Sequence, residues 1–182
     1  MKKTAMLFAN GFEEVEALTV VDLLRRAEIG CDIVALDGAS EVTGSHGIAV
    51  RADKAFDAVS VDGYDALLLP GGQPGTTNLG NDERVLTLLR EFNRAGKLTA
   101  AICAAPTVLA KAGLLEGRRA VCYPGLEDKL TGRVGGDDPV EVDGTVITSR
   151  GVGTAIPFAL ALVEYFCGAE RARELARSIV FR

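Results

Sequence analysis

Short apolar runs alternate with amphipathic stretches along the whole chain. Continuous apolar runs are typical of strands buried on both faces, whereas apolar positions three and four residues apart indicate helices. The pattern predicts strands at 5–9, 33–36, 66–69, 98–102, 119–122, 140–142 and 146–148. It predicts helices at 13–27, 84–95, 105–112, 155–166 and 169–177. Short apolar segments around Val42 and at 48–50, with Gly44 and Gly47 between them, resemble a hairpin.

Continuous apolar strands that alternate with helices indicate an α/β fold with a mostly parallel sheet covered on both faces. No linker or repeat interrupts the alternation, so we expect one domain over residues 1–182. In open parallel sheets, ligands bind beyond the carboxyl ends of the strands, where the strand order reverses. The functional site is therefore expected at the carboxyl ends of the predicted strands.

The charge balance narrows the class of partner. Twenty basic and 25 acidic residues give a net charge of −5 and a sequence pI near 5.0. A chain of this charge repels polyanions, so we expect neither nucleic acid nor an anionic membrane as a partner. The first apolar run ends at Ala9 and Glu13 follows soon after; the run is shorter than the roughly 7–15 residues of a secretory core. We expect a cytoplasmic protein.

The four cysteines, Cys31, Cys103, Cys122 and Cys167, lie far apart and form no CxxC pair. In a reducing compartment this spacing favours free thiols over a disulfide framework. A metal site built from several histidines is excluded because His46 is the only one, and no spacing of thiols and carboxylates suggests another kind. We expect no metal and no cofactor.

Cys103 stands at the end of the apolar run 98–102, and Ala104, Ala105 and Pro106 follow. Proline is favoured at the first position of a helix, so the segment predicts strand, tight turn and helix with Cys103 in the turn. Amide hydrogens and the positive end of the helix dipole favour a thiolate there. A buried cysteine that packs as a small apolar residue is the alternative from this segment alone.

Two further segments follow predicted strands: 10–16, which carries three glutamates, and the glycine turn 70–73. If they converge on Cys103, the pocket holds a thiol, a carboxylate and amides that can bind an oxyanion. Compensation of the helix dipole explains Glu13 and Glu14 without catalysis. Glu16 is deeper in the helix and better placed to reach the pocket.

Four segments, in order, carry a resemblance: GFEEVE at 11–16, LPGG at 69–72, AICAAP at 101–106 and TSRGVGT at 148–154. Together they resemble the ThiJ/PfpI superfamily, in particular its DJ-1 (Parkinson-associated deglycase) branch, over essentially the whole chain. The resemblance implies a flavodoxin-like α/β sandwich, usually a homodimer. It also implies that Cys103 is a nucleophile and oxidation-sensing thiol, with Glu16 as its protonated hydrogen-bond partner. The amides of Gly72 and Ala104 would form the oxyanion pocket.

The resemblance assigns four further positions. Asp22 and Arg26 would be structural charges around the site and the dimer contact. Tyr123 stands where many members of the branch place a histidine, and a phenol is a much weaker base than imidazole at neutral pH. His46 stands where a pocket-facing residue of the partner subunit is expected; an exposed loop histidine is the alternative.

Activities of the branch include glutathione-independent glyoxalase, deglycation of amino groups modified by methylglyoxal or glyoxal, chaperone action and redox sensing. The protease branch has a histidine directly after its cysteine, where this chain has Ala104, so a cysteine peptidase is the least favoured function. We expect a cofactor-free glyoxalase or deglycase that acts on 2-oxoaldehydes or on glycated amino groups. A non-enzymatic redox sensor or chaperone-like protein is the alternative.

Two glycine-containing segments have simpler interpretations. The segment 151–154 lacks the lysine and spacing of a phosphate loop, and we expect a turn in which Thr154 caps the following helix. The segment 135–139 is expected to be a surface turn rather than a calcium site.

Overall fold

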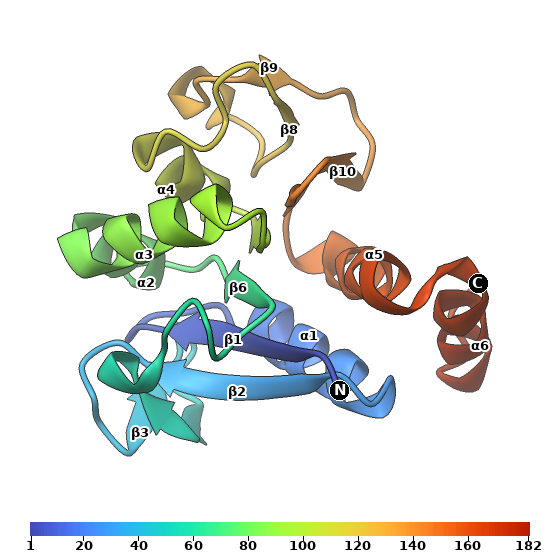
Figure 1. Cartoon of the computed structure of the whole chain (residues 1–182), viewed down its shortest axis with the longest axis horizontal. Coiled ribbons are helices and arrows are strands. Elements are labelled where there is room, and N and C mark those ends of the chain that lie inside the picture. Colours follow the sequence, from blue (N-terminus) through green and yellow to red (C-terminus); the bar gives the residue numbers. More distant parts are fainter.

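A seven-stranded sheet runs through the computed structural model, which describes residues 1–182 (Figure 1). Its strands are β1 (Lys3–Phe8), β2 (Gly30–Ala35), β5 (Lys54–Ala55), β6 (Ala66–Leu69), β7 (Leu98–Ile102), β10 (Val140–Asp143) and β11 (Val146–Ser149). They lie in the order β10-β11-β7-β6-β1-β2-β5, and all neighbours are parallel except β10, which pairs antiparallel with β11. The α/β class with a mostly parallel sheet is confirmed.

The strand order reverses beside β1. From β1 the chain continues to β2 and β5 on one side, and then returns to β6, β7 and β11 on the other. The crevice between the carboxyl ends of β1 and β6 is therefore the place where such a sheet binds ligands. The segments 10–16 and 70–73 leave these two strands at that end.

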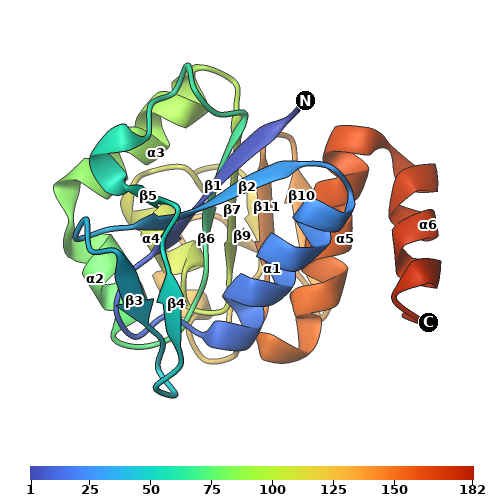
Figure 2. The same cartoon turned by 90° about the horizontal axis from the view of Figure 1, so that it is seen from below.

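Helices cover both faces of the sheet (Figure 2). One face carries α1 (Glu14–Arg26) and α5 (Ala155–Cys167), and α6 (Ala169–Ser178) packs against α5. The other face carries α2 (Gly75–Asn81), α3 (Glu83–Arg94) and α4 (Pro106–Lys111). Because both faces are covered, the strands are apolar at nearly every position, and this produced the continuous runs in the sequence.

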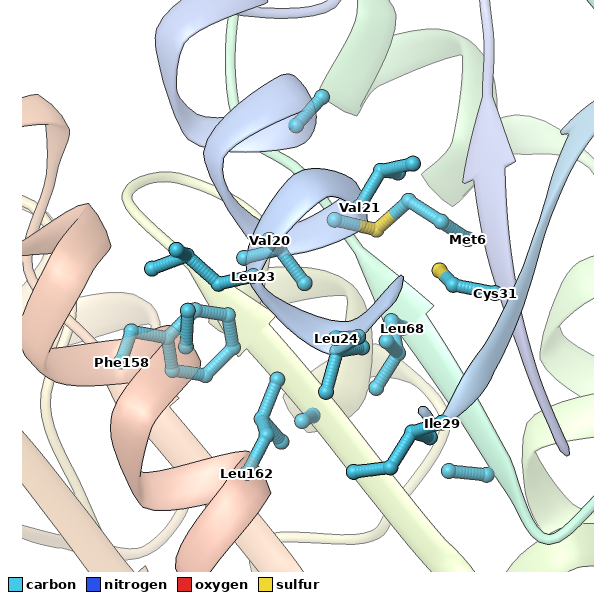
Figure 3. Packing of buried hydrophobic residues seen from close by; sticks show 14 of the residues in the cluster. Met6, Val20, Val21, Leu23, Leu24, Ile29, Cys31, Leu68, Phe158 and Leu162 are labelled. Atoms are coloured by element: carbon cyan, nitrogen blue, oxygen red, sulfur yellow. The ribbon is translucent and has the colours of Figure 1, made fainter. Parts of the chain in front are cut away.

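The core forms two layers because successive strand residues point to opposite faces. Along β1, Met6 and Phe8 belong to one layer and Ala5 and Leu7 to the other, and all four are fully buried. Figure 3 shows the first layer, where side chains of α1 and α5 meet Leu68 of the sheet. Each large apolar side chain buried here contributes roughly 1.5–3 kcal/mol, so the layers hold α1 firmly against the sheet.

The smaller elements lie outside the main sheet. The predicted hairpin is confirmed as antiparallel β3 (Glu41–Thr43) and β4 (Ala49–Arg51). The remaining short elements are β8 (Arg119–Ala120), β9 (Arg133–Val134) and the 3-10 turns η1 (Phe56–Ala58), η2 (Glu127–Lys129) and η3 (Val152–Thr154). The predicted strand at 119–122 was too long: β8 pairs only with β9, and the next N–H, of Val121, donates to Thr148 Oγ1 at 2.9 Å.

Helix α2 was not predicted, because its sequence, GTTNLGN, has no apolar period. All four cysteines are free, as expected. None of the helices combines the length and the apolar character that spanning a membrane requires.

Candidate active site

Cys103 occupies a sharp turn directly after β7, as the sequence predicted. Its φ of 65° is in the left-handed region, which costs a non-glycine residue roughly 1 kcal/mol or more. Two backbone hydrogen bonds hold it there: its N–H donates to the Ser149 carbonyl at 3.0 Å, and its carbonyl accepts from the Tyr123 N–H at 2.7 Å. Pro106 opens α4 three residues later. The turn lifts the sulfur above the sheet, where the side chain is partly exposed.

Glu16 reaches the sulfur from the first turn of α1. Its side chain is fully buried, and its Oε2 accepts a hydrogen bond from the Gly71 N–H at 2.9 Å. A Cβ on Gly71 would lie 2.5 Å from Cys103 Cβ and 2.6 Å from Glu16 Oε2. Only glycine therefore lets the carboxyl, the thiol and the turn after β6 meet. The three segments converge as predicted, and the carboxyl and the thiol both lie against Gly71, close enough for each to shift the pKa of the other.

Glu16 and Cys103 change each other's ionisation. Burial raises the pKa of Glu16 to about 7, although the Cys103 thiol and the Gly71 N–H lower it. Burial also raises the pKa of Cys103 to about 12, and the Glu16 carboxylate adds to this effect. Both groups cannot be charged cheaply at contact distance, so the pair shares a proton at neutral pH. The expectation that the helix end favours a thiolate was incomplete, because burial and the carboxylate outweigh it.

Two backbone amides face the sulfur. The N–H groups of Ala104 and Gly72 lie close enough to the Cys103 sulfur to lower its pKa. Gly72 has a φ of 91°, and a Cβ at this position would collide with the backbone nitrogen of Glu13. The two amides predicted as an oxyanion pocket are thus brought together at the thiol, where they can stabilise negative charge on sulfur or on a bound oxygen.

A cavity of about 810 Å³ opens above the thiol. Besides Cys103, Glu16 and Gly72, its walls include Glu13, His46, Tyr123, Asp137, Arg150 and residues 151–154. The cavity makes the thiol reachable for a small molecule. Tyr123, at the position where a histidine was expected, is 53% exposed and lines it.

Arg150 is the one positively charged side chain in the cavity wall besides a protonated His46, and it was not among the site residues predicted from the sequence. Its Nη1 donates to the carbonyl oxygen and to Oδ1 of Asp137, both at 3.1 Å. Its Nε and Nη2 have no protein acceptor and are free for a ligand. The arginine is part of the 148–154 motif, and a basic residue beside a predicted cavity was the signal that could have identified it.

Glu14 differs from the prediction. Instead of only compensating the helix dipole, it is buried and its Oε1 accepts from the backbone N–H of His46 at 2.7 Å. Its Oε2 contacts His46 Nδ1 at 2.9 Å. Burial raises its pKa, but the His46 side chain and the backbone donors outweigh this and lower it to about 2. A Cβ on Gly44 would collide with this carboxyl, so the glycine in the β3–β4 turn was the available signal.

Other expected residues lie elsewhere. Asp22 and Arg26 form an exposed ion pair with each other at 2.7 Å and do not line the cavity, so within one chain the expectation that they surround the site is wrong. Their expected place at the dimer contact stays a prediction. Thr154 Oγ1 accepts from the N–H groups of Arg150 and Gly151 at 3.2 and 3.0 Å. Thr154 stands at the N-cap position of α5, but its side chain makes no capping hydrogen bond to that helix, because its hydroxyl oxygen is used to close the preceding turn.

Comparison with known proteins extends these observations. The DJ-1/PfpI family model matches residues 2–165. Protein dj-1beta of Drosophila melanogaster is 39% identical over 183 residues, which cover 99% of this chain and 98% of that protein. Its crystal structure matches with a TM-score of 0.95 at 38% identity, over 100% of this chain and 98% of the other.

Two further relatives differ in what their names state. Deglycase PH1704 of Pyrococcus horikoshii is 37% identical over 152 residues, 81% of this chain and 89% of that protein. The structure of oxidized Toxoplasma gondii DJ-1 has a TM-score of 0.94 at 35% identity, covering 100% of this chain and 99% of the other. The similarity to both solved structures includes every segment that forms the cavity.

Proposed function

The chain belongs to the DJ-1/PfpI family, and from this premise we propose that it is a cofactor-free enzyme that uses Cys103 on reactive 2-oxoaldehydes or their adducts. Family membership confirms the resemblance that the four motifs carried. The observation that supports the proposal is the contact between a reachable thiol and a buried carboxyl beside two free amides. Such a set can form a covalent adduct, stabilise its oxyanion and move a proton.

With methylglyoxal, the Cys103 thiol passes its proton to the Glu16 carboxylate as the sulfur attacks the aldehyde carbon. A carbon–sulfur bond forms, and the carbonyl electron pair moves to oxygen, beside the amides of Gly72 and Ala104. This oxygen takes the proton from Glu16, which gives a hemithioacetal and a carboxylate. The carboxylate is then ready to act as a base.

Glu16 next removes the proton from the former aldehyde carbon, and the electron pair moves to the neighbouring ketone oxygen through an enediol. Return of this proton to the second carbon, together with transfer of the hydroxyl proton from the first oxygen to the second, oxidises the first carbon and reduces the second, so no external oxidant is needed. The product is a thioester of lactate, and water breaks its carbon–sulfur bond. A pKa of Glu16 near 7 suits a group that both accepts and donates a proton at neutral pH.

Glycated amino groups fit the same site. In the adduct of a 2-oxoaldehyde with an amine, the sulfur can displace nitrogen at the former aldehyde carbon, and Glu16 can protonate the departing amine. The name of Deglycase PH1704 supports this substrate class. The free nitrogens of Arg150 can bind the carboxylate that either route produces.

Redox sensing is the second candidate function, and the partial exposure of Cys103 beside two amides favours it. Peroxide can transfer oxygen to a thiolate in two steps, and the amides would stabilise the sulfinate that forms. The homodimer and the cytoplasmic location stay predictions.

Purified protein mixed with methylglyoxal tests the proposal. We expect lactate formation that Cys103→Ser and Glu16→Gln abolish and that Cys122→Ser leaves intact, since Cys122 is buried outside the cavity. Lactate formation equal in wild type and Cys103→Ser would contradict the enzyme. Sulfinate at Cys103 after graded peroxide, without turnover, would support the sensor instead.

A further inference from the structure

Four side-chain atoms that can ligate a metal ion meet where the β3–β4 turn contacts the start of α1. They are Glu13 Oε2, Glu14 Oε2, Ser45 Oγ and His46 Nδ1, which we call the mouth cluster. We propose that the mouth cluster binds a divalent transition-metal ion such as Zn²⁺. The site is distinct from the thiol: Glu13 and His46 also line the cavity, whereas Glu14 and Ser45 do not.

The separations between these atoms fit one ion. His46 Nδ1 lies 2.9 Å from Glu14 Oε2 and 3.6 Å from Glu13 Oε2. Ser45 Oγ lies 3.4, 3.3 and 3.1 Å from the Glu13 oxygen, the Glu14 oxygen and the His46 nitrogen. A tetrahedral ion with bonds of about 2.0–2.1 Å places its ligands about 3.3 Å apart. The ligand atoms of Glu13, Glu14 and His46 all lie within 4.8 Å of one another.

Backbone donors orient both carboxylates so that one oxygen of each stays available. Glu14 Oε1 accepts from the N–H groups of His46 and Ile48 at 2.7 and 3.5 Å. Glu13 Oε1 accepts from the Val15 N–H at 3.4 Å. The Oε2 atoms of both residues therefore face His46. Metal sites use outer hydrogen bonds of this kind to fix their ligands.

Charge and exposure also suit a cation. Two carboxylates and a neutral imidazole give the mouth cluster a charge of −2, and oxygen ligands with one imidazole suit Zn²⁺, Mn²⁺ and Co²⁺. The Glu13 and Glu14 side chains are 14% and 4% exposed, whereas that of His46 is 70% exposed, which leaves an entry path and room for water. The sequence did not predict this site, because a single histidine does not indicate a metal centre unless the fold brings carboxylates to it.

Without a metal ion, the mouth cluster is held together by a protonated His46 that pairs with the two glutamates. Hydrogen bonding to Glu14 raises the pKa of His46, and the negative charge of Glu13 adds to this. An ion must displace that proton, so its affinity is expected to fall as pH is lowered.

Metal binding to the full-length, metal-free protein tests the proposal without any measurement of activity. Binding of Zn²⁺ is measured by calorimetry at pH 7.5. We expect one ion to bind per chain, and we expect the Cys103→Ala variant to bind it as well. His46→Gln and Glu13→Gln are expected to weaken it at least about tenfold. Glu83→Gln is the matched control, because it makes the same chemical change at an exposed glutamate on α3.

The visible spectrum of bound Co²⁺ separates the mouth cluster from the thiols. Ligation by oxygen and imidazole gives no thiolate charge-transfer band, which is the expected result. Three outcomes would overturn the proposal: no saturable binding at one ion per chain, unchanged affinity in His46→Gln, or a thiolate band that accompanies binding. Unchanged affinity between pH 7.5 and pH 5.5 would also contradict ligation through His46.

Discussion

Glu14 and Glu16 are two residues apart on α1, both are buried, and their carboxyls behave in opposite ways. The pKa of Glu14 falls to about 2, whereas that of Glu16 rises to about 7. Glu14 meets two backbone N–H groups and an imidazole, which favour the charged form. Glu16 meets one N–H and a thiol, which do not offset the loss of hydration. Burial alone therefore does not fix the ionisation of a carboxyl; the number of donors around it does.

The same difference separates a structural carboxylate from the one that we propose to carry a proton in catalysis. Glu14 fastens the β3–β4 turn to the start of α1 and stays charged at any ordinary pH. Glu16 keeps a proton that it can exchange near neutrality, beside the only cysteine in the cavity wall. Substitution of each glutamate by its amide tests this division directly.

The largest expected effect is on turnover. Glu16→Gln removes the proton carrier, and we expect kcat for lactate formation from methylglyoxal to fall roughly 10²–10⁴-fold. Glu14→Gln, assayed in parallel at a temperature where it is folded, is expected to keep kcat within about tenfold, since its carboxyl lies outside the cavity. Equal losses in the two variants would show that the two carboxyls do not have separate roles.

The next effect comes from the turn that joins Glu16 to Cys103. Gly71→Ala places a methyl group against the thiol and the carboxyl, and a displacement of about 1 Å can cost roughly 10²-fold in rate. We expect kcat to fall by about that factor while the far-ultraviolet circular dichroism spectrum stays unchanged. The control is Gly80→Ala in α2, whose new Cβ would lie 3.4 Å from Val108. Full activity in Gly71→Ala would mean that the contact is not needed.

Glu14→Gln and Glu16→Gln should also change the stability of the protein in opposite directions. Glu14 stabilises the folded state at pH values above its unfolded pKa of about 4.5, and this stabilisation is lost as the pH falls through about 2. The raised pKa of Glu16 gives a contribution that is present below 4.5 and lost as pH rises through 7. The linkage gives an upper limit of roughly 3 kcal/mol for either group.

Urea unfolding at pH 5 and pH 8 measures this difference. Glu14→Gln is expected to lower the free energy of unfolding at both pH values. Glu16→Gln is expected to leave it nearly unchanged at pH 5 and to raise it at pH 8, where the wild-type carboxylate is charged and buried. A loss of stability in Glu16→Gln at pH 8 would contradict the raised pKa.

The smallest effect is expected at His46, whose side chain is exposed. Because the pKa of His46 is raised, its ion pair with Glu14 is fully formed below pH 6.5 and is lost as the pH rises through the raised pKa. With a chelator present, we expect hydrogen exchange in the β3–β4 turn to show more opening at high pH in wild type. His46→Gln should remove this pH dependence; its persistence would assign the effect to another group.

The sequence identified the part of the site around the thiol because its signals were local. An apolar run that ends on Cys103 before Pro106 defines a strand, a turn and a helix, and their geometry places the sulfur. The position of Glu16 followed from the first helix and the rule for the ends of parallel strands. Glu14, by contrast, was assigned to the helix dipole, and Asp22 and Arg26 were wrongly placed around the site.

The sequence by itself determined the strands and helices, because buried strands and amphipathic helices require particular apolar periods. It also determined which end of the sheet carries the thiol. Only the tertiary structure decided which glutamate is charged. Residues two positions apart on a helix point about 200° apart, so Glu14 and Glu16 face different neighbours. Those neighbours, Gly44 and His46 on one side and Gly71 and Cys103 on the other, come from distant segments that only the folded chain brings together.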